Sequence, residues 1–379
     1  MGLFSRHLAS HFFGLAGALF VNRSESKVLP YTLPPILGSI TEEEVRALFQ
    51  YEVYGVMPET LPDMSAGVVE EGEAFNGTAS RKQIALTLSR GGRSATLNLL
   101  IYIPKGMKSY PAILASNFDG NYSVSSDGAV LATPVWSRRF AGTKRVFHER
   151  NRNKHANRLP VEVILEQGYA VVTFCYGDAD PDYDDGFKNG VHALYPELQS
   201  REDNWASVGA WAWSFSRVLD FLQTEKEIDA NRVALYGFSR LGKASLWAGA
   251  CDSRFGAILC EGSGKGGVSL SRRNFGESLH LINLRFPHWF SKSFHGYAQR
   301  PQKLLVDQHM LMALMAPRPL LVSVGKDDWW SDPEGTKLAL QAVEEKAGKS
   351  TYLYEHEGTH EPRLVDWGRY LDFLDAEMS

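Results

Sequence analysis

The sequence predicts an α/β fold whose central sheet is mostly parallel and is covered by helices on both faces, in three layers. From residue 110 onward, short and nearly continuous apolar segments alternate with helical segments, and each apolar segment is followed by Gly, Asn or Asp. Continuous apolar strands that alternate with helices are typical of parallel sheets with both faces buried. Functional sites of such sheets lie beyond the carboxyl ends of the strands.

Two further elements are expected ahead of this alternation. Thr41 and the three acidic residues after it predict the start of a helix, and Gly55 predicts its end. The β-like segments 81–90 and 95–104 flank a Gly-Gly turn and predict a hairpin. The later strands are expected at 110–118, 169–178, 232–239, 256–262, 319–328 and 351–358, and helices at 207–225 and 241–252. Residues 262–312 are interpreted as a long insertion or lid between two strands.

Composition excludes several classes of protein. The chain has 379 residues, of which 44% are apolar and 22% charged, as in ordinary globular proteins. A net charge of −4 gives no indication of a nucleic-acid partner or a polybasic membrane anchor. Three cysteines are too few for a disulfide scaffold, although one bridge stays possible. We expect Cys175 and Cys260 to be small buried side chains.

The N-terminus has two interpretations. Arg6 and His7 precede an apolar segment at 12–21, which has the length of the apolar region of an export signal. This segment is too short to span a membrane, and an amphipathic helix is the alternative. We expect residues 1–28 to be a signal peptide or extension and 29–379 a single catalytic domain. The protein is then secreted or periplasmic, and we expect a monomer.

The segment "RVALYGFSRLGKASLWAGA" (232–250) reads as strand, tight turn and helix. Its turn carries Ser239 between Gly237 and Gly242, and the small glycines leave room for a serine that projects above the sheet. The match to the G-x-S-x-G nucleophile elbow is imperfect, since the second glycine comes one residue late. The alternative role for this serine is a helix N-cap.

The residues downstream of Ser239 follow the order of an α/β-hydrolase, which is serine, acid and then histidine. The strand at 319–328 is followed by three candidate acids, Asp327, Asp328 and Asp332. His360 follows the last strand and is the predicted base. In this arrangement the imidazole takes the serine proton, and the carboxylate orients the imidazole and stabilises its charged form.

Residues 356–360 also fit H-E-x-x-H, the signature of zinc proteases. That signature needs both histidines on one face of a helix. Here the alternation of "TYLYEHE", followed by Gly358 and Pro362, predicts the end of a strand and a loop. We therefore expect no metal site, and we expect His356 to be structural.

The turn "GFSRLGK" (237–243) resembles the G-C-S-R-x-G-K signature of glucuronoyl esterases, carbohydrate esterase family 15. The resemblance extends over most of the chain from about residue 30. It includes the segments "FQYEVYGVMP", "SNFDGNYSV", "GYAVVTFCYGDADPD", "WAWSFSRVLDFL", "SGKGGVSLSRRNFGE", "FPHWFS", "DQHMLMALMAPRPLLV" and "DDWWSDPEG".

The resemblance implies an α/β-hydrolase that needs no cofactor and cleaves esters between lignin alcohols and (4-O-methyl-)glucuronic acid on xylan. It implies Ser239 as nucleophile and Arg240 as an oxyanion-stabilising residue. It also implies that Lys243, Glu277 and Trp330 contact the sugar. Without the resemblance, these three would be a solvated helix residue, an ion-pair partner of Arg272 or Arg273, and a core aromatic.

The sequence departs from the family pattern at two places. Phe238 replaces a cysteine, which removes a disulfide seen in some members. Many members carry a catalytic Glu where this chain has Gly262, and Glu261 lies one residue early, which in an extended chain turns a side chain the other way. Other members place an Asp two residues before a Trp, and Asp328 holds that position before Trp330 in this chain. The resemblance therefore implies Asp328 as the acid, with Glu261 as the first alternative and Asp327 or Asp332 after it. A changed acid also leaves open an acetyl or other sugar esterase, and a non-catalytic carbohydrate-binding relative.

Overall fold

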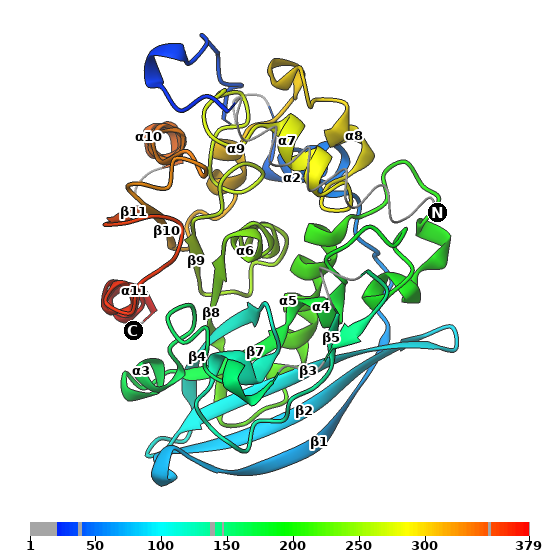
Figure 1. Ribbon diagram of the computed structural model, residues 1–379, viewed down its shortest axis with the longest axis vertical. Helices are drawn as coiled ribbons and strands as arrows, with labels where there is room; N and C mark the ends of the chain where they lie inside the picture. The colour runs from blue at the N-terminus through cyan, green and yellow to red at the C-terminus, as the bar shows by residue number, and fades with distance from the viewer. Residues whose placement is uncertain (1–20, 37–39, 137–140, 146–147, 348–349, 379) are drawn as a thin grey trace.

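A nine-stranded sheet forms the centre of the computed structural model (Figure 1). The structure describes residues 21–36, 40–136, 141–145, 148–347 and 350–378. In spatial order the strands are β1 (Asp63–Ala74), β2 (Ala79–Arg90), β3 (Arg93–Pro104), β7 (Ala170–Cys175), β4 (Tyr110–Asn117), β8 (Ile228–Phe238), β9 (Ala257–Glu261), β10 (Leu320–Gly325) and β11 (Thr351–His356). Two short strands, β5 (Val135–Trp136) and β6 (Lys144–Arg145), pair separately.

The predicted sheet is confirmed, with one strand that the sequence did not reveal. β1, β2, β3 and β7 pair antiparallel in succession, and from β7 across to β11 every pair is parallel. The predicted hairpin is β2–β3, and all six later strands lie where they were expected. β1 was missed because it is an edge strand with one pairing partner and almost wholly exposed side chains, so it lacks an apolar pattern.

Helices cover both faces of the sheet, as predicted. One apolar core joins the sheet to α2 (Glu42–Phe49), α5 (Ser207–Leu222), α6 (Arg240–Cys251), α9 (Gln308–Ala313) and α10 (Pro333–Ala347). A second core joins its other face to α3 (Val161–Glu166) and α11 (Asp366–Met378). In Figure 1, α10 and α11 accordingly lie on opposite sides of β10 and β11. The other α-helices of the described residues are α4 (Tyr176–Ala179), α7 (Leu279–Arg285) and α8 (Lys292–His295).

The predicted helix starts where it was expected, with α2, and continues beyond Phe49 as a π-helical turn, Gln50–Tyr54. The Thr41 side chain accepts a hydrogen bond from the Glu44 backbone at 3.2 Å, and the Glu44 carboxylate accepts one from Thr41 N at 2.6 Å. This reciprocal capping box satisfies two backbone donors that the first turn leaves unpaired. The chain then leaves its helical path at Gly55, whose φ of +83° is in the region that favours glycine.

The long segment between β9 and β10 carries α7, α8 and α9 and folds back onto the body of the protein. Its residues 288 and 289 accept hydrogen bonds from the first turn of α5: His288 O from Ser207 N at 2.9 Å and Trp289 O from Val208 N at 3.2 Å. The predicted insertion is therefore a packed part of the structure, tied to a helix that belongs to the main core.

The described N-terminal residues lie against the same segment. Asn22 O accepts a hydrogen bond from Gly276 N at 3.0 Å, and Leu29 N donates to Asn274 Oδ1 at 2.7 Å. The Arg23 guanidinium lies 3.7 Å from the centre of the Trp329 ring. The predicted signal segment falls almost entirely on residues 1–20, which lie outside the described residues.

All three cysteines are free thiols, so the single bridge that the sequence left possible is not formed. Cys175 and Cys260 are buried, as expected. In the described part of the chain, no helix is long and apolar enough to cross a membrane.

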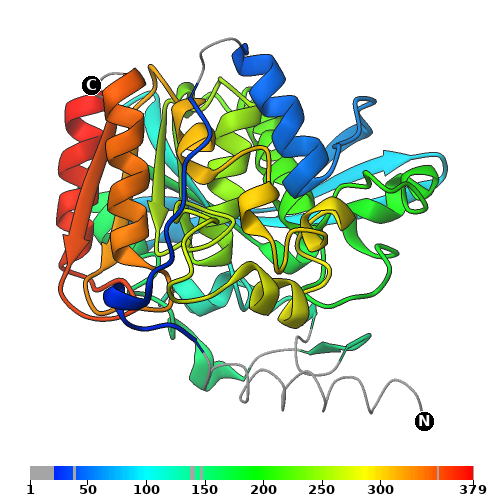
Figure 2. The same cartoon turned by 90° about the horizontal axis from the view of Figure 1, so that it is seen from above.

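The candidate residues of the site all follow the carboxyl ends of parallel strands. Ser239 follows β8, Gly262 follows β9, Asp328 follows β10 and His360 follows β11. In Figure 2 the orange-red strand β11 points down the page, and loops follow below its end. The fold thus gathers, at one edge, residues as far apart in the sequence as Ser239 and His360, which are separated by 121 positions.

We expect Gly237→Ala to destabilise the protein by about 3 kcal/mol, because overpacking a close-packed turn forces the backbone to move. A Cβ at Gly237 would lie 2.2 Å from Leu241 O and 2.5 Å from Ser245 Oγ. Gly67→Ala is the matched control, since a Cβ there meets nothing within 4 Å. Urea unfolding of both variants measures the difference, and equal stabilities would contradict the packing argument.

Candidate active site

The turn at Ser239 is the sharpest feature of the site. Ser239 lies between the last residue of β8 and the first of α6, with φ 58° and ψ −124°. Such a backbone is costly for a residue with a Cβ and persists only where the surroundings impose it. Ser239 N donates to Glu261 O at 2.8 Å, which ties the turn to the neighbouring strand. Ser239 occupies the N-cap position, but its side chain makes no capping hydrogen bond, so its Oγ is available for another contact.

Ser239, His360 and Asp328 form one chain of hydrogen bonds. His360 Nε2 lies 2.9 Å from Ser239 Oγ, and His360 Nδ1 donates to Asp328 Oδ2 at 2.7 Å. The carboxylate is 4% exposed and the imidazole 38% exposed, so one end of the chain is buried and the other is open. The carboxylate fixes the tautomer that leaves Nε2 able to accept the serine proton. The structure thus brings together Ser239, His360 and one of the three acids that the chain order left open, Asp328, which the family resemblance implied.

The other candidate acids lie elsewhere. Asp327 is exposed. Asp332 is fully buried and pairs with Lys265 at 2.8 Å and with Arg273 at 3.0 Å. Glu261 accepts hydrogen bonds from His356 Nε2 at 3.0 Å and from Tyr370 OH at 2.5 Å. None of these contacts involves His360.

Gly262 explains why Glu261 does not reach His360. A Cβ built on Gly262 would lie 3.5 Å from both Nδ1 and Cε1 of the His360 ring. Position 262 therefore faces the imidazole, and position 261 faces away from it. The one-residue shift noted in the sequence thus places the carboxylate away from the imidazole, although the chain has already left the extended conformation at Gly262, whose φ is +53°.

The two histidines of the H-E-x-x-H pattern make different contacts. His356 is the last residue of β11, and His360 lies in the loop after it, so the helix that a zinc protease requires is not formed. His356 is buried with Glu261 on one side and Asp366, 3.8 Å away, on the other. Burial alone would lower the pKa of His356, but the hydrogen bond and charge of Glu261 outweigh it and raise that pKa. No group of three His, Cys, Asp or Glu side chains among the described residues could hold a metal ion.

Arg240 lies beside the nucleophile and is firmly held. Its guanidinium pairs with the buried carboxylate of Asp182 and lies 4.6 Å from the centre of the Trp289 ring. Asp182 was missed by sequence reasoning, because one acid in a loop carries no periodicity or spacing. The only signal was its place at the end of the segment "GYAVVTFCYGDADPD", which belongs to the family resemblance.

Lys243 and Glu277 are buried together near the nucleophile. Lys243, one turn along α6 from Ser239, is 4% exposed and donates to Ser263 O. Burial lowers the pKa of Lys243 to about 8, although the charge of Glu277 opposes that shift. Burial likewise raises the pKa of Glu277, against the charges of Lys243 and Arg285. Each group has its charged form disfavoured by burial and supported by the other group.

The alternative roles of these side chains can now be judged. Lys243 is not solvated, and Glu277 pairs with neither Arg272 nor Arg273: these arginines are bound by Asp307 and Asp332. Glu277 N donates to Trp330 O at 3.0 Å, so the two predicted sugar contacts lie on adjoining loops. Trp330 is partly exposed rather than part of the core, and Arg285 lies 5.3 Å from its ring centre.

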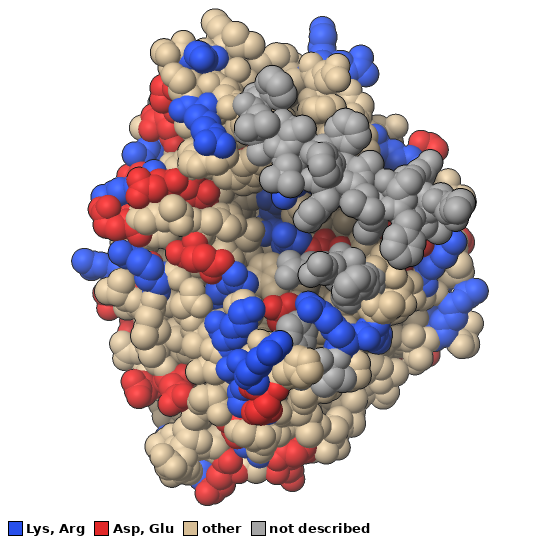
Figure 3. Space-filling view, viewed as in Figure 1, with Lys and Arg blue, Asp and Glu red and all other residues tan. Residues whose placement is uncertain are grey.

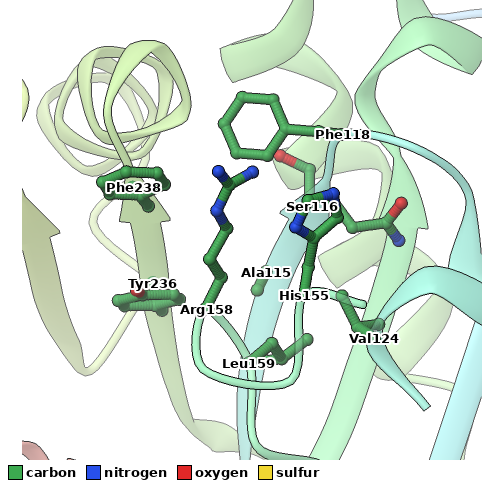
Figure 4. A pocket seen from close by; sticks show the side chains of 10 residues that line it. Ala115, Ser116, Phe118, Val124, His155, Arg158, Leu159, Tyr236 and Phe238 are labelled. Carbon is green, nitrogen blue, oxygen red and sulfur yellow. The ribbon is translucent and has the colours of Figure 1, made fainter. Parts of the chain in front are cut away.

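Phe238 packs beside the imidazole ring of His360. Its ring centre lies 5.0 Å from that of His360. Figure 4 shows the Arg158 side chain rising between Phe118 and Phe238 beside a cavity of about 10 Å³. The Arg158 guanidinium is 5.2 Å and 5.1 Å from the two ring centres. An aromatic residue at position 238 thus fills the space next to the histidine.

Figure 3 shows the same face of the molecule as Figure 1. The space-filling view of this face shows a hollow near its middle, in which both basic and acidic side chains are visible (Figure 3). Basic and acidic groups around a concave surface can together orient a polar ligand by hydrogen bonds.

Comparisons with known proteins identify a family for the chain. A family model described as glucuronyl esterase of fungi matches residues 156–352. A carbohydrate esterase from an unknown prokaryotic organism is 35% identical over 94% of this chain and 92% of its own length. A 4-O-methyl-glucuronoyl methylesterase from Schizophyllum commune is 26% identical over 81% of this chain and 71% of its own length.

Solved structures match over the same extent. A glucuronoyl esterase from Solibacter usitatus has a TM-score of 0.88 at 34% identity, covering 94% of this chain and all of its own. A promiscuous esterase of the same family from a marine bacterial metagenome has a TM-score of 0.84 at 34% identity, with the same coverage. The chain belongs to the glucuronoyl esterases of carbohydrate esterase family 15, and its fold is that of an α/β-hydrolase.

Proposed function

We propose that this protein is a serine-type carboxylic ester hydrolase that cleaves esters of glucuronic acid. The hydrogen-bonded chain from Ser239 through His360 to Asp328 is the single observation that carries the reaction type. The name of the Schizophyllum relative, a 4-O-methyl-glucuronoyl methylesterase, supports glucuronate as the acid part of the ester.

The first step is attack on the ester carbonyl by Ser239 Oγ. His360 Nε2 takes the hydroxyl proton as the C–O bond forms, and Asp328 stabilises the imidazolium. The carbonyl oxygen becomes an oxyanion. Arg240 lies next to the nucleophile, and a fixed cation there stabilises charge that develops only in the transition state. The tetrahedral intermediate collapses when the alcohol leaves with the proton from His360.

The second step repeats this chemistry with water. His360 Nε2 deprotonates a water molecule, which attacks the glucuronoyl-serine ester. The C–O bond to Ser239 breaks, Oγ recovers its proton, and glucuronic acid is released. These two steps use the side chains of the site and water.

The sugar is recognised by the buried pair and the tryptophan beside it. Lys243 and Glu277 present an ammonium donor and carboxylate acceptors close to the nucleophile, which suits the hydroxyl groups of a glucuronate ring. Buried polar groups of this kind reject an ester that cannot pair with them, because they would be left without partners. Trp330 offers a partly exposed aromatic surface next to Glu277.

The natural substrate in this proposal is the ester between a lignin alcohol and (4-O-methyl-)glucuronic acid on glucuronoxylan. The family resemblance supports this finer assignment, which also fits a secreted or periplasmic protein. The export signal remains a prediction, since its apolar segment lies almost wholly outside the described residues.

Cleavage of acetyl esters is the second candidate. The related esterase from the marine metagenome is described as promiscuous, which favours testing a broader range of esters. The buried pair argues for glucuronate, because an acetyl group offers Lys243 and Glu277 no hydroxyl groups.

We expect the protein to hydrolyse methyl or benzyl glucuronate, and Ser239→Ala to lower kcat by at least about 10³-fold. Release of glucuronic acid measures the reaction, and acetylated xylan tested in parallel compares the two candidates. Equal and slow hydrolysis of glucuronate esters by wild type and Ser239→Ala would refute the proposal. Faster turnover of acetylated xylan would favour the second candidate.

We expect Asp328→Asn to lower activity and Glu261→Gln to lower stability. Asp328→Asn removes the carboxylate that orients His360 and should lower kcat by about 10³-fold or more, with little change in stability. Glu261→Gln breaks a buried pair with His356 and should cost about 3 kcal/mol of unfolding free energy. Its kcat per folded molecule should stay within a few-fold of wild type.

The pH dependence adds a check on the Glu261 variant. Glu261 raises the pKa of His356 in the folded protein. The pair therefore contributes its full stabilisation of the folded protein at pH values below the ordinary imidazole pKa. That contribution is lost as the pH rises through the raised pKa. The stability difference between wild type and Glu261→Gln should therefore shrink with rising pH, and a large loss of kcat in Glu261→Gln alone would reverse the acid assignment.

We expect KM for methyl glucuronate to rise as the pH passes about 8, where Lys243 loses its proton and becomes a weaker donor. The values of kcat should change less over the same range, because the triad does not include this amine. Lys243→Gln is the comparison: it should raise KM at pH 7 and abolish the dependence of KM on pH. If KM of Lys243→Gln still rises as the pH passes about 8, a group other than Lys243 is responsible and the prediction is wrong.

A further inference from the structure

Asp182 is a buried carboxylate that receives donors from three separate parts of the chain. Its Oδ2 accepts from Arg240 Nη1 and from Tyr176 OH, the latter at 2.7 Å. Its Oδ1 accepts from His288 Nε2 at 3.0 Å and from Trp289 Nε1 at 2.7 Å. The side chain is 2% exposed. A carboxylate with two donors on each oxygen has no freedom to rotate.

We infer that Asp182 is a positioning residue, which holds the Arg240 guanidinium in the place where it stabilises the oxyanion. This inference rests on the proposed esterase function. It assigns a role in the reaction to a residue that makes no contact with Ser239, His360 or Asp328 in the described structure.

The backbone that carries Asp182 is fixed independently of Arg240. Two residues earlier, Asp180 Oδ1 accepts from His192 Nδ1 at 2.6 Å, and both side chains are buried. Asp180 O also accepts from Trp211 Nε1, on α5, at 3.0 Å. The carboxylate of Asp182 therefore presents a stationary partner, whereas an arginine side chain by itself has many rotamers.

Aromatic rings confine the guanidinium from another direction. Phe286 and Trp289 are stacked with ring centres 3.8 Å apart and planes within 5°. The Arg240 guanidinium carbon lies 4.6 Å from the Trp289 centre and 5.3 Å from the Phe286 centre. Trp289 thus contacts the cation with its ring and, through Nε1, the carboxylate that pairs with it.

This arrangement leaves a donor of Arg240 unused. Within the described residues, Arg240 Nε is buried and has no hydrogen-bond partner. That N–H is closed to solvent and therefore to a substrate oxygen, whereas the Arg240 side chain as a whole is 17% exposed. The charge of the guanidinium, one residue from the nucleophile, is therefore the property of Arg240 that stabilises the transition state. A cation already held in place adds no reorganisation when the charge of the oxyanion appears.

The alternative is that Asp182 only links loops together. In that case its loss would lower stability without changing the chemistry of the folded enzyme. A double-mutant cycle separates the two cases, because two residues that act through one interaction give losses that are not additive. An oxyanion forms with every ester, so the cycle can be measured on a simple ester as well as on a glucuronate.

The experiment compares wild type, Asp182→Asn, Arg240→Gln and the double variant on methyl glucuronate and p-nitrophenyl acetate. We expect Asp182→Asn to lower kcat by about 10- to 100-fold on both esters, with KM changed less than about threefold. The double variant should be no slower than Arg240→Gln alone. Multiplicative losses in the double variant, or a loss confined to KM, would overturn the inference.

Two further variants keep the test decisive. Asp178→Asn alters a half-buried acid of the same segment, which accepts hydrogen bonds from Asn98 on β3, and it should leave kcat unchanged. If Asp182→Asn does not fold, His288→Gln removes one donor from Asp182 and should give a several-fold loss of kcat that disappears in the Arg240→Gln background. An equal loss in both backgrounds would overturn the inference.

The simple ester also separates this inference from the proposed function. If wild type cleaves p-nitrophenyl acetate but not methyl glucuronate, the proposed substrate is wrong, and the coupling between Asp182 and Arg240 is still measured. If both esters are cleaved and the two residues show no coupling, the substrate assignment stands and the role of Asp182 is wrong.

Discussion

The backbone of Ser239 is the constraint on which the rest of the site depends. Its φ of 58° is unfavourable for a serine, so the surrounding structure must impose it. The bond from Ser239 N to Glu261 O fixes the turn against β9, and Gly237 allows α6 to approach β8 closely. Because the strain turns Oγ away from the cap position, the serine is free to bond His360. Relaxation of this turn would separate the nucleophile from its base.

The ends of β9 and β10 explain how an acid after either strand can contact the histidine. Three parallel strands end side by side, and the residues just beyond β9 and β10 both face the imidazole. A Cβ at Gly262 would lie against the His360 ring, and Asp328 reaches that ring from β10. With a glycine after β9, the carboxylate from β10 completes the chain of hydrogen bonds. Glu261, one residue earlier, binds His356 and Tyr370 instead and joins two elements of the core.

The sequence was sufficient for features that repeat along the chain or occur in a fixed order. The alternating apolar segments predicted the parallel sheet and its helices. The order along the chain predicted that Ser239, an acid after β10 and His360 would meet, and the family resemblance selected Asp328 among three acids. It was not sufficient for β1, whose exposed side chains carry no apolar period, or for Asp182, whose importance lies in partners far along the chain. Nor could it show that Lys243 and Glu277 are buried together, since helix spacing places a residue on a face but does not reveal what covers that face.

The buried pair beside the nucleophile suggests how binding and charge depend on each other. Burial disfavours the charged forms of Lys243 and Glu277, and their mutual attraction offsets only part of that cost, so the pKa of each moves toward its neutral form. Hydroxyl groups of a bound sugar would restore hydrogen bonds that water supplied before burial. They would favour the ammonium and the carboxylate together, because each charged form makes stronger hydrogen bonds than its neutral form. Recognition of the sugar and ionisation of the pair therefore reinforce each other, and an ester without hydroxyl groups would leave both residues in the less favourable state.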